Sequence, residues 1–150
     1  MKISVGLPAL PDLPKVGSNA RKAHWAQVAR FKREERDKWR ILLIQAGYTL
    51  RTAEEGPVLR SPVHITATLY FRDHRLPDEH NLAEAIKVLV DLLQVNRLIQ
   101  LSGSSWRQTG FSGLIDDDRN LIWDQPPRIQ VDKEIAPFTV LTLTGAGHAK

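Results

Sequence analysis

Polar side chains that can bind a cation follow one another at helical spacing between residues 78 and 91. At about 100° of rotation per residue, one face of this segment carries an imidazole, an ammonium and two carboxylates, from His80, Glu84, Lys87 and Asp91. The opposite face is apolar and carries Leu82, Ala85, Ile86, Leu89 and Leu93. The pattern predicts an amphipathic helix that buries its apolar stripe in a core and leaves its polar stripe free for chemistry.

Asp78 stands at the expected start of this helix, where a carboxylate can cap the first amide groups or hold a cation. A second acidic group, Asp116 to Asp118, lies downstream. Two carboxylate groups that a fold brings together provide the oxygen ligands that Mg²⁺ and Mn²⁺ prefer. A structural interpretation is also open: Asp78 only caps the helix, Glu84 only pairs with Lys87, and the acidic run is a solvated turn. On the residues alone, the structural interpretation is favoured.

Length and composition limit the class of protein. The 150 residues with 42% hydrophobic content predict one domain with a packed core. The chain has no cysteine, which excludes disulfides, cysteine-based zinc sites and thiol nucleophiles. No apolar run reaches the roughly 18 residues of a membrane span, and the N-terminus lacks a signal pattern. We therefore expect a soluble intracellular protein.

Basic residues are concentrated near the N-terminus. The net charge is +4, but Lys15 to Arg40 alone contain nine Lys or Arg against three acids. Ser18 or Asn19 as N-cap and Gly47 as C-terminal stop predict one long helix here. Its expected buried stripe consists of Trp25, Val28, Phe31, Trp39, Leu42, Leu43 and Ala46. The basic face either contacts phosphates or is a solvated face with pairs such as Arg30 with Glu34. The excess of cations favours phosphate contact and a nucleic-acid partner.

Strands are predicted on both sides of the polar-stripe helix. Residues 2–7 alternate weakly up to Pro8 and predict a short first strand. Residues 63–71 alternate clearly, with Val63 and Ile65 on one face and His64 and Thr66 on the other. Later strands are expected over residues 120–123, 128–131 at a sheet edge, and 138–144. This order of elements predicts a single-domain α+β fold, a mixed β-sheet with helices packed on it.

The connecting segments are expected to be irregular. The central helix runs from about residue 78 to residue 93, and an extension towards Leu101 is open. Residues 102–113, with three glycines and four serines, predict a mobile loop. In this loop Trp106 and Phe111 either stack on an exposed base or fold back as a small hydrophobic patch. Residues 145–150 predict a disordered tail.

The run from Phe71 to Leu82, followed by Leu114 to Asp118, resembles the RusA-like Holliday-junction endonucleases of phages and prophages. In that family a strand leads through basic residues into an Asp-x-Asp-Asn-Leu helix, and a later Asp-Asp pair completes a Mg²⁺ site. The segment from Asn19 to Trp25 is also similar to the N-terminal part of phage members. The resemblance implies one RusA-like nuclease domain over residues 1–150. Its expected activity is metal-dependent resolution of Holliday junctions or other branched DNA in recombination and repair.

The family motif transfers to this sequence with two departures and one insertion. The first motif aspartate falls on Asp78 and the later catalytic carboxylate on Asp118. The second motif aspartate is replaced by His80 and the helix lysine by Glu84, so Lys87 on the same face is the substitute cation. An insertion around residues 94–112 separates the helix from the acidic run.

The resemblance implies a complete set of site residues. Catalytic roles fall on Asp78, His80, Lys87 and Asp118. Metal ligation falls on Asp78, His80, Glu84, Asp117 and Asp118. DNA contacts fall on Asn19, Arg21, Lys22, His24, Arg30, Arg33, Arg72, Arg75 and Asn81.

The implied cofactor is Mg²⁺ or Mn²⁺, and an imidazole ligand favours Mn²⁺. The implied partners are a four-way DNA junction and a second copy of the chain, since cutting two strands requires two related sites. Neither a membrane nor a nucleotide cofactor is expected, and the expected compartment is the cytoplasm of a bacterial or phage-infected cell. Two alternatives remain: a catalytically impaired branched-DNA-binding protein of the same fold, and a structural or protein-interaction domain.

Overall fold

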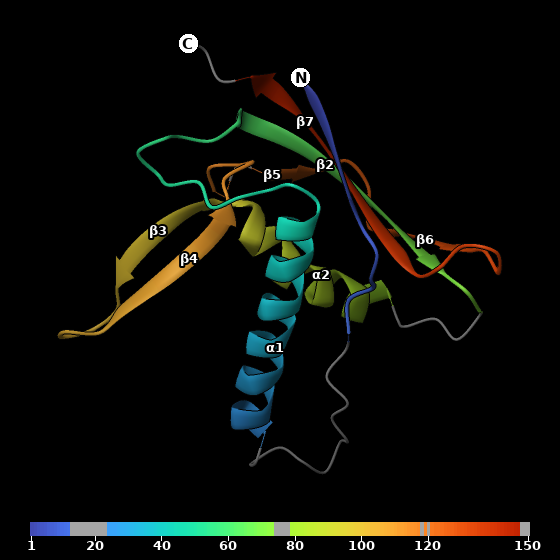
Figure 1. The fold of residues 1–150 in the computed structure, drawn as a ribbon, viewed down its shortest axis with the longest axis horizontal. Helices are drawn as coiled ribbons and strands as arrows, with labels where there is room; N and C mark the ends of the chain where they lie inside the picture. Colours follow the sequence, from blue (N-terminus) through green and yellow to red (C-terminus); the bar gives the residue numbers. More distant parts are fainter. Residues whose placement is uncertain (13–23, 74–78, 118, 120, 148–150) are drawn as a thin grey trace.

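The structure, a computed structural model, describes residues 1–12, 24–73, 79–117, 119 and 121–147, with the side chains at 24–26 and 79–81 left out. Both helices and strands are present, which confirms the α+β class (Figure 1). In chain order the elements are β1 (Lys2–Leu7), α1 (His24–Gln45), β2 (Leu59–Phe71), α2 (Glu79–Leu93), β3 (Val95–Gln100), β4 (Trp106–Ser112), β5 (Leu121–Trp123), β6 (Arg128–Val131) and β7 (Phe138–Gly147).

A five-stranded mixed sheet forms the centre of the fold (Figure 1). β7 lies between β1 and β2 and is antiparallel to both. β5 and β6 are both parallel to β2 and pair with Val63–Ile65 and Thr68–Phe71, respectively. Parallel neighbours need a crossover connection. The segment between β2 and β5, which contains α2, supplies that crossover and packs α2 against the sheet.

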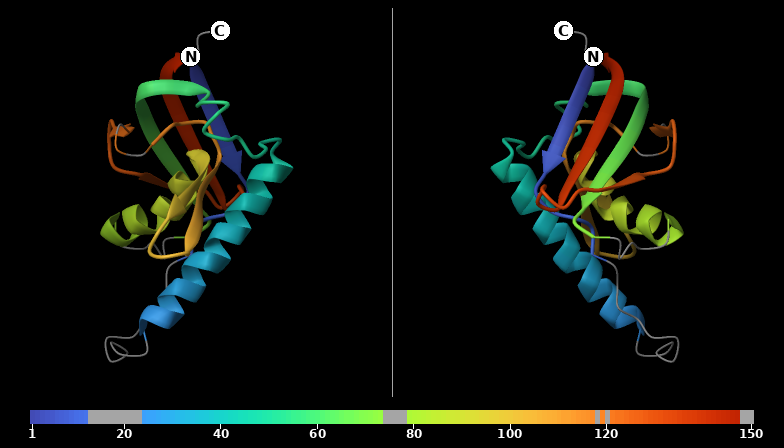
Figure 2. Two further views of the ribbon diagram at one scale, coloured as in Figure 1. Left: turned by 90° about the vertical axis from the view of Figure 1, so that its left-hand side faces the viewer. Right: turned by 90° about the vertical axis from the view of Figure 1, so that its right-hand side faces the viewer.

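The core lies between one face of this sheet and the two helices. β2 buries Val63, Ile65, Ala67 and Leu69, which confirms the predicted alternation. α2 buries the whole predicted apolar stripe, Leu82, Ala85, Ile86, Leu89 and Leu93. In both side views the strands β1, β2 and β7 of the main sheet rise above α2 (Figure 2). The polar stripe of α2 is therefore turned away from the core.

The buried stripe of α1 differs from the prediction. Trp39 and Leu43 are fully buried, but Val28, Phe31 and Leu42 are only half-buried. Ala46 is exposed because the helix has already ended at Gln45, before the left-handed Gly47 (φ 97°). A carboxylate, Glu35, occupies a core position instead. The predicted helix start at Ser18 or Asn19 and the side chain of Trp25 lie outside the described residues.

The predicted loop over residues 102–113 is largely wrong, as is the helix extension towards Leu101. β3 and β4 form an antiparallel two-stranded hairpin that extends away from the main sheet (Figure 1). β4 covers residues 106–112 of the expected loop. Gly103 (φ 57°) stands in the turn, so the Gly and Ser residues make a tight turn rather than a long loop. Phe111 packs in the core, whereas Trp106 is 55% exposed.

Met1 and the last residues of β7 lie together at one end of the sheet (Figure 1). The N-terminal ammonium of Met1 donates to the carbonyl oxygen of Gly145 at 2.8 Å, and Gly147 pairs with Leu59. The predicted disordered tail is thus wrong for residues 145–147, which extend β7 because β2 offers them a partner strand. Residues 148–150 lie outside the described part. Neither α1 nor α2, as described, is long and apolar enough to cross a membrane.

Candidate active-site groove

α2 presents its polar stripe to solvent. The side chains of Glu84, Lys87 and Asp91 are exposed. His80 and Asn81 lie in the first turn of the helix, and their side chains fall outside the described residues. The helical register matches the predicted one and spreads the stripe over about 16 Å from His80 to Asp91.

A groove of about 560 Å³ runs beside this stripe, and we call it the α2 groove. One wall is α2, which contributes Glu84 and Lys87, and the other is the chain from Leu121 to Pro127, which contributes Asp124. Two carboxylates and one ammonium therefore share one hollow. Carboxylate oxygens are ligands for hard divalent cations, and an ammonium attracts phosphate.

The acidic run leading into this wall is paired with arginine. Arg97 of β3 donates from Nη1 to the carbonyl oxygen of Asp116 at 3.1 Å and forms an ion pair with its carboxylate. Asp117 accepts from the backbone nitrogen of Arg119 at 2.9 Å, and its Oδ2 lies 2.7 Å from Nη2 of Arg119. These guanidinium groups partly neutralise both carboxylates.

The acidic run meets α2 at the C-terminal end of the helix. The backbone nitrogen of Ile115 donates to the carbonyl oxygen of Leu93 at 3.0 Å, and Val95 donates back to Ile115 at 3.0 Å. Asp117 is two residues further on and so within about 7 Å of Ile115. His80 is at the other end of a helix about 22 Å long. The chain then passes back along α2 and brings Asp124 beside Glu84 and Lys87.

Only part of the predicted site therefore lies within the described residues. Glu84 and Lys87 share a groove, but that groove is not lined by Asp117. Within the described residues, no group of three or more His, Asp or Glu side chains is placed to hold a metal ion. Two predicted ligands, Asp78 and Asp118, lie outside the described part, as does the side chain of His80.

The predicted DNA contacts are described in part. Arg30 and Arg33 are exposed on α1. Arg72 is exposed just after β2, and its Nε donates to the carbonyl oxygen of Ile135 at 3.4 Å. Asn19, Arg21, Lys22 and Arg75 lie outside the described residues, as do the side chains of His24 and Asn81.

A His–Asp pair next to the groove was missed by the sequence reasoning. Nδ1 of His64 lies 2.6 Å from Oδ1 of Asp124, and both side chains are about half exposed. The pair forms because the β2–β5 register sets His64 opposite Ile122, two residues before Asp124. Alternation in β2 placed His64 on the outer face, but nothing local to the sequence reveals its parallel neighbour.

A buried carboxylate fixes α1 to the chain that follows β1. Oε2 of Glu35 accepts from Nε1 of Trp39 at 3.1 Å and from the backbone nitrogen of Asp12 at 3.3 Å, and Oε1 lies 2.8 Å from Nζ of Lys38. Lys38 also donates to the carbonyl oxygen of Leu10 at 2.9 Å. Burial raises the pKa of Glu35 above its ordinary value, and the ammonium of Lys38 opposes this rise. These contacts hold the orientation of α1.

Comparison of the sequence with protein-family models and with curated proteins found no match.

Proposed function

We propose that the chain is a metal-dependent endonuclease that cuts branched DNA, such as a Holliday junction. The observation that carries the proposal is the α2 groove, where Glu84 and Lys87 face a wall containing Asp124. Carboxylates and a cation in one hollow are the groups that metal-assisted phosphodiester hydrolysis uses. The sequence resemblance to RusA-like nucleases supplies the branched substrate and the second copy of the chain.

The donor chemistry of the groove fits a hard divalent cation, because the candidate ligands in its lining are the carboxylates of Glu84 and Asp124. Asp78, His80, Glu84 and Asp118 are the residues proposed to hold Mg²⁺ or Mn²⁺, whereas Asp117 lies outside the groove and is paired with Arg119. A bound ion of this kind polarises a phosphate and lowers the pKa of its water. In this proposal Lys87 binds a non-bridging phosphate oxygen and stabilises the negative charge that develops there.

The proposal can be tested on a supercoiled plasmid that extrudes a cruciform. A dimer with two related sites should cut both strands within one encounter and yield linear DNA in Mg²⁺ or Mn²⁺. A plasmid without the inverted repeat, and a reaction containing EDTA, should remain supercoiled. Equal cutting of both plasmids would contradict branch selectivity, and nicked circles as the final product would contradict paired sites.

A second candidate function is DNA binding without catalysis. It is favoured by the guanidinium groups on Asp116 and Asp117 and by the lack of a three-ligand group among the described side chains. A protein of this kind would retain the junction with salt-dependent affinity, yet leave it intact in both metals. A purely structural domain would show no salt-dependent affinity for DNA.

A further inference from the structure

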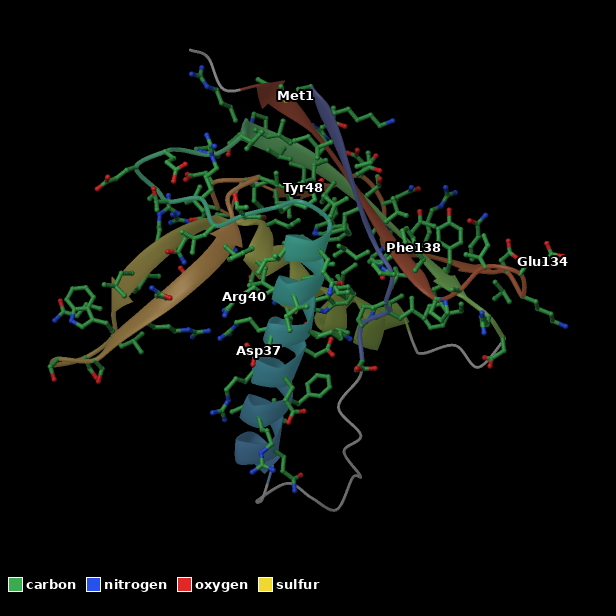
Figure 3. All side chains as sticks on the ribbon, in the orientation of Figure 1. Met1, Asp37, Arg40, Tyr48, Glu134 and Phe138 are labelled. Carbon is green, nitrogen blue, oxygen red and sulfur yellow. The ribbon has the colours of Figure 1, made fainter. Side chains whose placement is uncertain are left out.

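A second hollow, separate from the α2 groove, lies between α1 and the β3–β4 hairpin. It has a volume of about 400 Å³, and we call it the arginine cleft. α1 contributes Arg36 and Arg40, and the hairpin contributes Arg107, Gln108 and Thr109. Figure 1 shows the hairpin and α1 extending from the main sheet next to each other, and Figure 3 labels Arg40 on the hairpin side of the helix. The hairpin that replaced the expected loop thus forms a wall.

The arginines of α1 form a stripe. Arg33, Arg36 and Arg40 lie within about 60° of one another around the helix, and Arg36 and Arg40 are separated by about 6 Å along its axis. Successive guanidinium groups at this separation can contact separate anionic groups. Arg30 lies about 60° from Arg33 but about 120° from Arg36, and neither Arg30 nor Arg33 lines the cleft. The structure thus selects Arg36 and Arg40, which the sequence analysis did not single out.

The cleft has an excess of positive charge. Its lining holds three guanidinium groups and one carboxylate, that of Asp91. In the part of the chain that the structure describes, Arg36, Arg40 and Arg107 take no part in any of the ion pairs. Like charges gathered in one hollow repel one another, and an anionic ligand would relieve this repulsion.

The cleft also offers orientation and hydrogen bonding. The guanidinium carbon of Arg40 lies 5.9 Å from the centre of the ring of Phe111, which is buried and therefore fixed. Stacking on a ring restrains the plane of the guanidinium group. Gln108 and Thr109 add neutral polar groups beside it. The restrained guanidinium group of Arg40 and these neutral polar groups are suited to phosphodiester oxygens.

We propose that the arginine cleft binds the phosphodiester backbone of one DNA strand, with Arg36, Arg40 and Arg107 as its phosphate contacts. The inference rests on the proposed function and deepens it. Asp91, in the last turn of α2, lines the cleft, and the polar stripe continues along the helix from Asp91 to Lys87 and Glu84 in the α2 groove. A strand held in the cleft is thereby directed along α2 towards the proposed catalytic groups.

The test is fluorescence anisotropy with a labelled oligothymidine and a labelled four-way junction, titrated at several KCl concentrations in EDTA. The variant Arg36→Gln/Arg40→Gln/Arg107→Gln should bind both at least roughly tenfold more weakly. The slope of log affinity for the oligothymidine against log salt should fall by about 2, since each lost contact to a single strand removes about 0.7. A matched control, Lys2→Gln/Arg60→Gln/Lys133→Gln, removes three exposed cations outside the cleft and should bind within about twofold of the natural protein.

The pair Arg40→Gln/Arg107→Gln, at two exposed positions, serves as a second variant should the triple change impair folding, and should lower the slope by about 1.4. An unchanged slope in the folded cleft variants, or an equal loss in the control, would overturn the inference. The inference would also be overturned if the cleft variants lost binding to heparin but kept binding to DNA, because the cleft would then bind another polyanion. EDTA prevents cutting, so binding and incision are measured separately. If the cleft variants lose affinity but the natural protein does not cut the junction in Mg²⁺ or Mn²⁺, only the proposed nuclease activity is contradicted. If the natural protein cuts the junction but the cleft variants bind it as tightly, only the cleft proposal is contradicted.

Discussion

At the scale of single residues, Lys87 is the described side chain with the most specific proposed role. It is exposed on α2 and lines the α2 groove opposite Asp124. Replacing Lys87 with Met keeps an unbranched side chain that is one atom shorter and removes the charge. Incision of a bound junction should fall about a hundredfold, the typical effect of losing one group that stabilises a developing oxyanion. Affinity measured in EDTA should fall by less than about threefold.

The matched control for Lys87→Met is Lys133→Met, at another exposed position, between β6 and β7. It should leave both incision and binding unchanged. If Lys87→Met lowered binding and incision by the same factor, Lys87 would be a DNA contact and not a stabiliser of the reaction.

His80 determines the expected choice of metal. Mg²⁺ prefers oxygen ligands, whereas Mn²⁺ accepts an imidazole nitrogen more readily. The natural protein should therefore cut faster in Mn²⁺ than in Mg²⁺, and His80→Asp should shift this ratio towards Mg²⁺ by roughly tenfold. Junction incision in each metal gives the ratio. An unchanged ratio, with cutting still abolished by Asp78→Asn, would show that His80 does not contact the metal.

Glu35 should give stability a measurable pH dependence. Because burial raises its pKa above the ordinary value of 4.5, the native state binds more protons than the unfolded state between those two pKa values. The contribution of Glu35 to stability is therefore largest below 4.5 and falls as pH rises through the folded-state pKa. Gln keeps an acceptor for Trp39 but does not titrate.

Urea unfolding at a series of pH values measures this effect. The free energy of unfolding of Glu35→Gln minus that of the natural protein should increase with pH across this window and then level off. Glu34→Gln, at an exposed neighbouring position, should show no such trend. A difference for Glu35→Gln that stays constant or falls with pH would mean that Glu35 is not held by burial in the way described.

At the scale of elements, the shape of the β3–β4 hairpin depends on Gly110. It has φ 71° and stands next to a register shift in which Val95 pairs with both Phe111 and Ser112. A Cβ atom at this position would clash with the carbonyl oxygen of Val95. Gly110→Ala should therefore lower the free energy of unfolding by about 2 kcal/mol or more, and it should weaken DNA binding by displacing Arg107.

Gly103→Ala is the control for this prediction. Gly103 also has a positive φ, 57°, but a Cβ there would meet no atom within 4 Å. Its cost should be limited to backbone strain of about 1 kcal/mol. Equal destabilisation by the two changes, measured by chemical denaturation, would contradict the steric role assigned to Gly110.

The elements that the sequence predicts well are those with a clear local pattern. The alternation from Val63 to Phe71 and the apolar stripe from Leu82 to Leu93 both appear in the core as expected. The hairpin was missed because polar side chains interrupt its short strands, Arg97 and Gln100 in β3 and Gln108 in β4. The glycines and serines around its turn therefore indicated a loop instead of two strands.

Long-range features had no local signal. The parallel pairing of β2 with β5 joins segments that lie more than fifty residues apart, and the His64–Asp124 pair follows from that register alone. The burial of Glu35 was missed because a carboxylate on a helix is usually solvated. The stripe of Arg33, Arg36 and Arg40 could have been found from helical spacing, but its partner Arg107 required the hairpin.

At the scale of the whole molecule, two hollows of different charge lie along α2. The arginine cleft is at the C-terminal end of the helix, and the α2 groove with its two carboxylates lies beside the middle turns. A phosphate backbone is attracted by the first hollow and repelled by the second unless a cation is bound there. Metal ions should therefore be needed for cutting but not for binding. In the proposed dimer, two such arrangements would each direct one strand of a junction to one groove.

The most direct measurement is single-turnover incision of an end-labelled synthetic four-way junction by saturating protein, in Mg²⁺ and in Mn²⁺. Asp78→Asn, assayed in parallel and matched for junction binding in EDTA, is the control. The natural protein should convert the bound junction to nicked duplex products in at least one metal, while the variant should cut at least roughly a hundredfold more slowly. A junction that is fully bound by the natural protein yet intact in both metals would contradict the nuclease assignment and leave a DNA-binding protein of this fold.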